Sequence, residues 1–151
     1  YKMLKPHLDF LLYQVCFPTI CLASEDIELF ENDPHEFVHR QNSPLADFYD
    51  PRMSAITLIT NIVKHRGKDV TRRMLAFLQE NLQRYITASS ETKNSIEKDG
   101  TLLVLGSLSE ILFQKNPYSS NVEGLLISNI FPEFSSPVGF LRSRACFSIR
   151  L

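Results

Sequence analysis

The sequence predicts an all-α fold, and three observations support that prediction. Apolar residues recur at three- and four-residue steps along most of the 151 residues, as they do on the buried face of a helix. Strict alternation of apolar and polar residues, which is typical of a half-buried strand, does not extend over any useful length. Capping side chains stand where the helical periodicity begins. The expected helices span residues 4–20, 25–31, 34–40, 51–66, 69–87, 97–114, 121–131 and 137–151.

The apolar periodicity justifies the longer helices in turn. In the first, Leu4, Leu8, Leu11, Leu12 and Val15 fall on one face. Similar apolar faces run through residues 70–85, 101–112, 122–130 and 138–149.

Helix starts are marked by an acceptor side chain that is followed by proline. Asp33-Pro34 opens one helix, and Glu36 adds a carboxylate at the third helical position. Asp50-Pro51 and Ser136-Pro137 repeat the device, and residues 120–123 have the pattern of a capping box. We therefore expect helices to begin directly after these signals.

Composition and charge exclude several classes of function. The chain has 16 Lys and Arg against 17 Asp and Glu, a formal net charge of −1, and it is 44% hydrophobic and 22% charged, as is usual for a globular domain. Without a basic excess there is no electrostatic case for direct binding of nucleic acid or of an anionic membrane surface. No apolar run approaches the ~18 residues of a membrane span, so no membrane partner is expected.

The cysteines indicate the cellular compartment of the protein, and the chain ends indicate whether the chain is part of a longer one. Three cysteines cannot form a closed disulfide set, and no Asn-x-Ser/Thr sequon occurs, which favours a reducing cytosolic or nuclear compartment. The chain begins at Tyr1 and stops at Leu151 within an apolar pattern. We therefore expect a segment of a longer protein.

A repeated unit favours a solenoid of antiparallel helix pairs, although the short polar loops would suit a compact bundle equally well. Phe131-Pro132 is followed by Ser136-Pro137 and then by Leu141-Arg142 with Ala145 three residues later, which is the pattern of a HEAT repeat. A looser version begins at Phe17-Pro18, 114 residues earlier. That separation fits about three repeats of ~40–47 residues.

Three motifs follow one another along nearly the whole chain. They are Asp33-Pro34-x-Glu36-Phe37-Val38-x-Arg40, then Lys98-Asp99-Gly100 with Gly106-Ser107-Leu108, then Phe131-Pro132-Glu133-Phe134 with Leu141-Arg142-x-Arg144-Ala145-Cys146. In this order they resemble the importin-β (karyopherin-β) superfamily, in the branch of importin seven and importin eight.

The resemblance implies a HEAT-repeat α-solenoid, a right-handed superhelix in which residues 1–151 form a segment from the central part of a longer nuclear transport receptor. Such a receptor carries protein cargo through the nuclear pore, binds nucleoporins and releases cargo under control of the Ran GTPase, which would bind parts of the parent outside this segment. It moves between cytoplasm and nucleus and is not an enzyme, and no cofactor is implied. The alternative function is a HEAT-repeat structural scaffold, such as a phosphatase-type regulatory subunit.

Six carboxylates within twelve residues are the candidate cargo-contacting site. No Lys or Arg lies among them, so their field would attract a basic cargo such as a ribosomal protein or a histone. The alternative is that several of them are helix caps, because carboxylates stabilise the first turn of a helix. This acidic cluster consists of Glu25, Asp26, Glu28, Glu31, Asp33 and Glu36.

No other group of residues in the sequence predicts a metal, catalytic or nucleic-acid-binding site. Cys16, Cys21, His35 and His39 approach the spacing of a Cys2His2 zinc finger, but carboxylates fill the interval and the apolar residues of a finger core are missing, so no metal is expected. No phosphate-binding loop or nucleophile elbow occurs, so no catalytic residues are expected. The basic run at residues 64–73 has no aromatic partners. It is interpreted as a helix cap and solvated surface, with contact to the acidic turn of a neighbouring repeat or of the cargo as the alternative.

Overall fold

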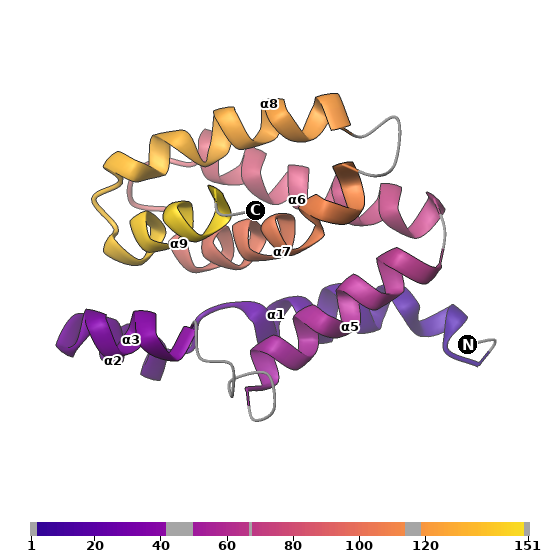
Figure 1. Cartoon of the computed structure of the whole chain (residues 1–151), viewed down its shortest axis with the longest axis horizontal. Coiled ribbons are helices and arrows are strands. Elements are labelled where there is room, and N and C mark those ends of the chain that lie inside the picture. The colour runs from indigo at the N-terminus through magenta and orange to yellow at the C-terminus, as the bar shows by residue number, and fades with distance from the viewer. Residues whose placement is uncertain (1–2, 42–49, 67, 114–118, 150–151) are drawn as a thin grey trace. The chain divides into compact units, whose positions relative to one another are not determined.

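The computed structural model describes residues 3–41, 50–66, 68–113 and 119–149. Every regular element within these ranges is helical, and none is a strand, which confirms the all-α prediction (Figure 1). The elements are η1 (Lys5–His7), η2 (Phe10–Cys16), α1 (Phe17–Ile20), α2 (Ser24–Asn32), α3 (Pro34–Gln41), α5 (Pro51–His65), α6 (Lys68–Thr87), α7 (Ser95–Phe113), α8 (Ser119–Asn129), η3 (Phe131–Ser135) and α9 (Gly139–Ile149).

The chain divides into two compact units, residues 1–62 and residues 63–151. In the first unit, the expected helix over 4–20 is helical from residue 5 to residue 20, but η2 within it is a π-helix that continues into the α-helical turn α1. The Phe17 N–H accordingly donates to the Leu12 carbonyl five residues back. Pro18 follows at once, and a widened turn relieves the clash of a proline ring with the preceding turn.

The buried stripe of this first segment differs from the predicted one. Leu8, Leu12, Cys16 and Ile20 are buried at four-residue steps, which a turn wider than 3.6 residues places on one face. Of the predicted face, Leu4 and Val15 are exposed instead. The prediction assumed the 3.6 residues per turn of a regular α-helix, which is too few for this segment.

One stretch of the described residues, Phe10–Asn32, has the length and hydropathy of a membrane-spanning helix. The prediction that no run approaches that length is corrected to this extent. The backbone is extended at Cys21 and at Ala23, however, and an interrupted hydrogen-bond ladder is costly in lipid. Length and composition alone are therefore weak support for a membrane span.

Arg52 joins three elements of the first unit. Its side chain is buried, and its Nε donates to the Ile20 carbonyl at the end of α1. One of its terminal nitrogens lies 3.2 Å from Oε1 of Gln41, the last residue of α3. The expected start of α5 is confirmed, since Asp50 Oδ1 accepts a hydrogen bond of 2.8 Å from the Arg52 N–H. Arg52 at the start of α5 therefore links α1 and α3.

In the second unit, α7 is the central helix. It packs against α6, α8 and α9, and the corresponding ribbons lie together in Figure 1. Residues 98–106 are all buried, as expected for a helix that is apolar on all sides. The core beneath it includes Leu82, Leu102, Ile130 and Ala145, and Ala145 is fully buried where α9 meets α7.

Two helix boundaries near the end of the chain lie two residues from the predicted ones. The helix expected over 121–131 stops at Asn129, and η3 follows with Pro132 in its first turn, since proline cannot continue the α-helical ladder. Ser136 does not cap α9. Its hydroxyl accepts from the Val138 N–H at 3.3 Å, and the first helical N–H groups bond to the Val138 carbonyl instead. The capping box at residues 120–123 lies outside the described side chains.

Candidate functional site

The acidic cluster lies on α2 and α3, and half of it stabilises local structure. The Asp26 carboxylate accepts the Ala23 N–H at 2.9 Å, before the first turn of α2. Asp33 Oδ1 accepts the Glu36 N–H at 2.9 Å, which confirms the predicted cap of α3. Glu36 Oε1 in turn accepts from Arg40 Nε at 2.8 Å.

The other half of the cluster has no such role. Glu25, Glu28 and Glu31 are all exposed, and no described residue pairs with them. Their three-residue spacing places them as a stripe along α2, a helix none of whose residues is buried. We call these three residues the acidic ridge.

The acidic ridge is electrostatically unfavourable for its own helix. Like charges three or four residues apart repel one another along a helix surface. Only Glu25, in the first turn, is stabilised by the positive end of the helix dipole. Glu31 lies in the last turn, where the dipole disfavours a carboxylate. Folding alone therefore does not explain the ridge, and its field is directed into solvent.

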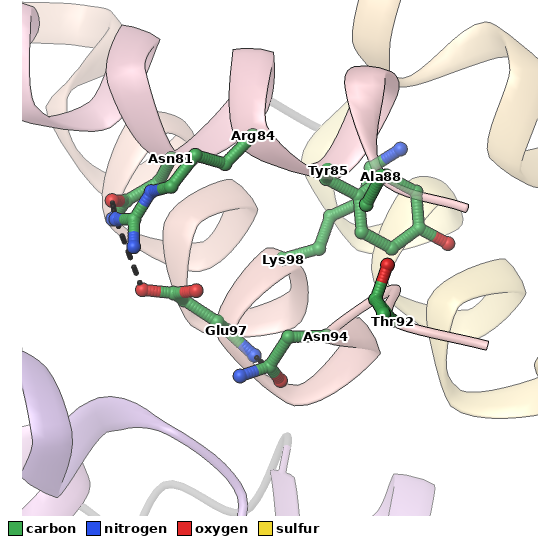
Figure 2. Close-up of a pocket in the computed structure, with 8 residues that line it drawn as sticks. All are labelled: Asn81, Arg84, Tyr85, Ala88, Thr92, Asn94, Glu97 and Lys98. Carbon is green, nitrogen blue, oxygen red and sulfur yellow. Dashed lines mark hydrogen bonds and ion pairs between the residues drawn. The ribbon is translucent and has the colours of Figure 1, made fainter. Parts of the chain in front are cut away.

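A pocket of about 310 Å³ lies at the turn between α6 and α7 (Figure 2). The last turns of α6 form one wall, and the start of α7 forms another. Asn94 Oδ1 caps α7 by accepting the Glu97 N–H at 3.0 Å. The lining residues are Asn81, Arg84, Tyr85, Ala88, Thr92, Asn94, Glu97 and Lys98.

The charges that line this pocket are paired. The Arg84 guanidinium lies 3.3 Å from Glu97 Oε1 and also donates to Asn81 Oδ1. Lys98 passes the ring of Tyr85, with its Nζ 4.1 Å from the ring centroid, and reaches Glu133 of η3. The charged residues that line the pocket thus hold α6, α7 and η3 together. Because these charges are paired, the pocket is suited to neutral polar groups.

Two consecutive charged residues of α7 form buried ion pairs that the sequence analysis did not assign. The side chains of Lys98 and Glu133 are 4% and 7% exposed. Next along the chain, Asp99 Oδ1 lies 2.8 Å from Arg144 Nε on α9. Burial lowers the pKa of Lys98, and the hydrogen bond with Glu133 opposes that shift. The available signal was two adjacent charges just before the apolar residues 102–105 of the same helix.

The remaining candidate residues are not brought together. Cys16 is buried in η2, and burial raises the pKa of its thiol. His35 and His39 are exposed on α3, and His39 Nδ1 lies 3.8 Å from Glu36 Oε2. Among the described residues no group of three or more His, Cys, Asp or Glu side chains has the arrangement of a metal site.

Comparison with known proteins links the chain to nuclear transport receptors. The Cse1 family profile matches residues 5–115. Over 147 residues, the chain is 40% identical to the importin beta-like SAD2 homolog of Arabidopsis thaliana, 39% to a probable importin-7 homolog of Dictyostelium discoideum and 33% to importin-8 of Homo sapiens. These alignments cover 97% of this chain and 14% of each relative. No solved structure matches it significantly.

Proposed function

The chain belongs to the Cse1 family of importin-β-related proteins, and from that premise we propose that it is part of a nuclear transport receptor. The observation that carries the proposal is the alignment of 97% of the chain with importins. We place residues 1–151 in the central part of the receptor as a HEAT-repeat segment. Ran would engage other parts of the receptor. The receptor would bind nucleoporins and pass between cytoplasm and nucleus.

In this function the segment acts by binding rather than by chemistry. Stacked helix pairs contact mainly their neighbours, so small rotations between repeats add up to a change in curvature. Cargo bound at one place and Ran bound at another would then be coupled through the shape of the solenoid, and the coupling free energy is the same in both directions. Within the second unit, the ion pairs of α7 hold η3 and α9 against it.

We further propose that the acidic cluster contacts basic protein cargo. The contribution comes from the acidic ridge of Glu25, Glu28 and Glu31, because Asp26, Asp33 and Glu36 already serve as caps or ion-pair partners. Exposed carboxylates on a helix with no buried residue present their charge to a partner at little structural cost. Ribosomal proteins and histones have the basic surfaces that such a ridge would attract.

The receptor function is tested by binding of the full-length protein to Ran. Ran loaded with GTP should bind the protein more tightly than Ran loaded with GDP, and it should displace a bound basic cargo. A structural scaffold, the alternative function, would ignore the nucleotide state. Equal retention of both forms of Ran in a pull-down would therefore reject the receptor proposal.

A further inference from the structure

The end of α5 and the beginning of α6 carry a concentration of positive charge in the second unit. Residues 64–73 contain five Lys and Arg side chains and one carboxylate, that of Asp69. All of these cations except Arg73 are exposed. We call the following residues the basic patch: Lys64, His65, Arg66, Lys68, Arg72 and Arg73.

Local structure explains only part of the basic patch. Asp69 is 3.0 Å from Arg72 and 3.3 Å from Arg73, so it offsets charge within the first turns of α6. Lys64 and His65 lie in the last turn of α5, where cations complement the helix dipole.

Lys68 has neither explanation. It is the first residue of α6, where the positive end of a helix dipole disfavours a cation, and it is exposed. Arg72 lies one turn further on, at a spacing where like charges repel. The patch therefore retains positive charge that does not contribute to folding.

The charge of the chain is divided between its two units. Residues 1–62 have four Lys and Arg against nine Asp and Glu, a net charge of −5, whereas residues 63–151 have twelve against eight, a net charge of +4. Residues 64–73 alone have a net charge of +4. The basic patch thus carries the net charge of its unit, and the rest of that unit is balanced.

We propose that the basic patch binds an Asp- and Glu-rich segment of a partner protein. Exposed lysines such as Lys64 and Lys68 offer point charges that attract carboxylates by charge complementarity. Nucleic acid fits less well, because residues 64–73 contain no aromatic side chain for base stacking and the chain as a whole is not basic. The patch belongs to the second unit and the acidic ridge to the first, and the patch takes a partner of opposite charge to that of the ridge.

The test uses the full-length protein and a fluorescein-labelled oligoglutamate peptide, with binding followed by fluorescence anisotropy. The variant Lys64→Glu/Lys68→Glu should bind the peptide about tenfold more weakly or worse at low salt, with a flatter dependence on salt concentration. The matched control is Lys5→Glu/Lys93→Glu, which makes the same charge change at exposed positions outside the patch. The control should bind as the unaltered protein does.

Two further measurements keep the result interpretable. Circular dichroism should show the same helical content and melting profile for both variants, since the substituted side chains are exposed. Equal weakening in the patch variant and the control would contradict the proposal, because it would indicate a general charge effect. Tighter binding of a single-stranded DNA oligonucleotide of equal charge would also contradict it and would assign the patch to nucleic acid.

Discussion

Helices α2 and α7 both carry several charged residues, and they use them in opposite ways. In α7, Lys98 and Asp99 are buried and each has a partner of opposite charge on another element. In α2, no residue is buried, and the acidic ridge has no described partner. Charged side chains therefore stabilise the fold where they are buried and paired with an opposite charge, as in α7. They remain available for binding where they are exposed and all carry the same charge, as in α2.

The largest expected effect concerns the enclosed charges of α7. Replacing Lys98 with Met leaves the Glu133 carboxylate buried without its cation, which typically costs about 3–5 kcal/mol of the free energy of unfolding. The double variant Lys98→Met/Glu133→Leu removes both charges and should recover most of that loss. Urea denaturation of the three proteins measures the difference.

The double variant is the control for this prediction. A double variant that is as unstable as the single one would show that the unpaired charge of Glu133 is not the cause of the lost stability.

The next effect concerns packing next to the paired charges. Ala145 is fully buried in a cluster with Leu82, Leu102 and Ile130. The substitution Ala145→Leu overpacks this contact and should cost about 1–3 kcal/mol. Ala76→Leu, the same change at an exposed position of α6, serves as the control and should leave the unfolding free energy nearly unchanged. An Ala145→Leu protein with unchanged unfolding free energy would mean that α7 and α9 do not approach as closely as described.

The smallest effects separate the caps of the acidic cluster from its ridge. The variant Asp33→Ala removes the acceptor for the Glu36 N–H and should cost about 1 kcal/mol. Glu31→Gln should be neutral, or stabilising by about 0.2–0.5 kcal/mol, because it relieves repulsion along α2. Thermal unfolding of both proteins ranks them. A ridge substitution that destabilises as much as the cap substitution would refute the division.

Local patterns in the sequence were sufficient for the fold class and for much of the helix inventory. The all-α HEAT-repeat class is confirmed, and the cap at Asp33 was correct because its hydrogen bond closes within three residues. The π-helical turn of η2 was missed, since a π-helix and an α-helix share apolar spacings over a few residues. The short helix η3 was missed because Pro132 can end one helix as readily as it starts another.

The roles of Lys98 and Asp99 were beyond local reasoning. Both residues belong to a motif that marked the family, yet their partners lie 35 and 45 residues away in the chain. Pairing over that distance depends on how α7 packs against η3 and α9, which no sequence period specifies. Within the acidic cluster, by contrast, the caps followed from position alone, and the structure then identified the three carboxylates that accept no described hydrogen bond and form no described ion pair.

The most direct test of the account is binding of a basic cargo to the full-length protein as salt concentration is varied. Histone H1 serves as the cargo, and the variant Glu28→Lys/Glu31→Lys is compared with Glu80→Lys/Glu123→Lys, a matched reversal at exposed carboxylates of the second unit. The account predicts weaker binding and a flatter salt dependence for the ridge variant alone, with unchanged unfolding. Unchanged affinity of the ridge variant at low salt would contradict it and leave the acidic ridge as solvated surface.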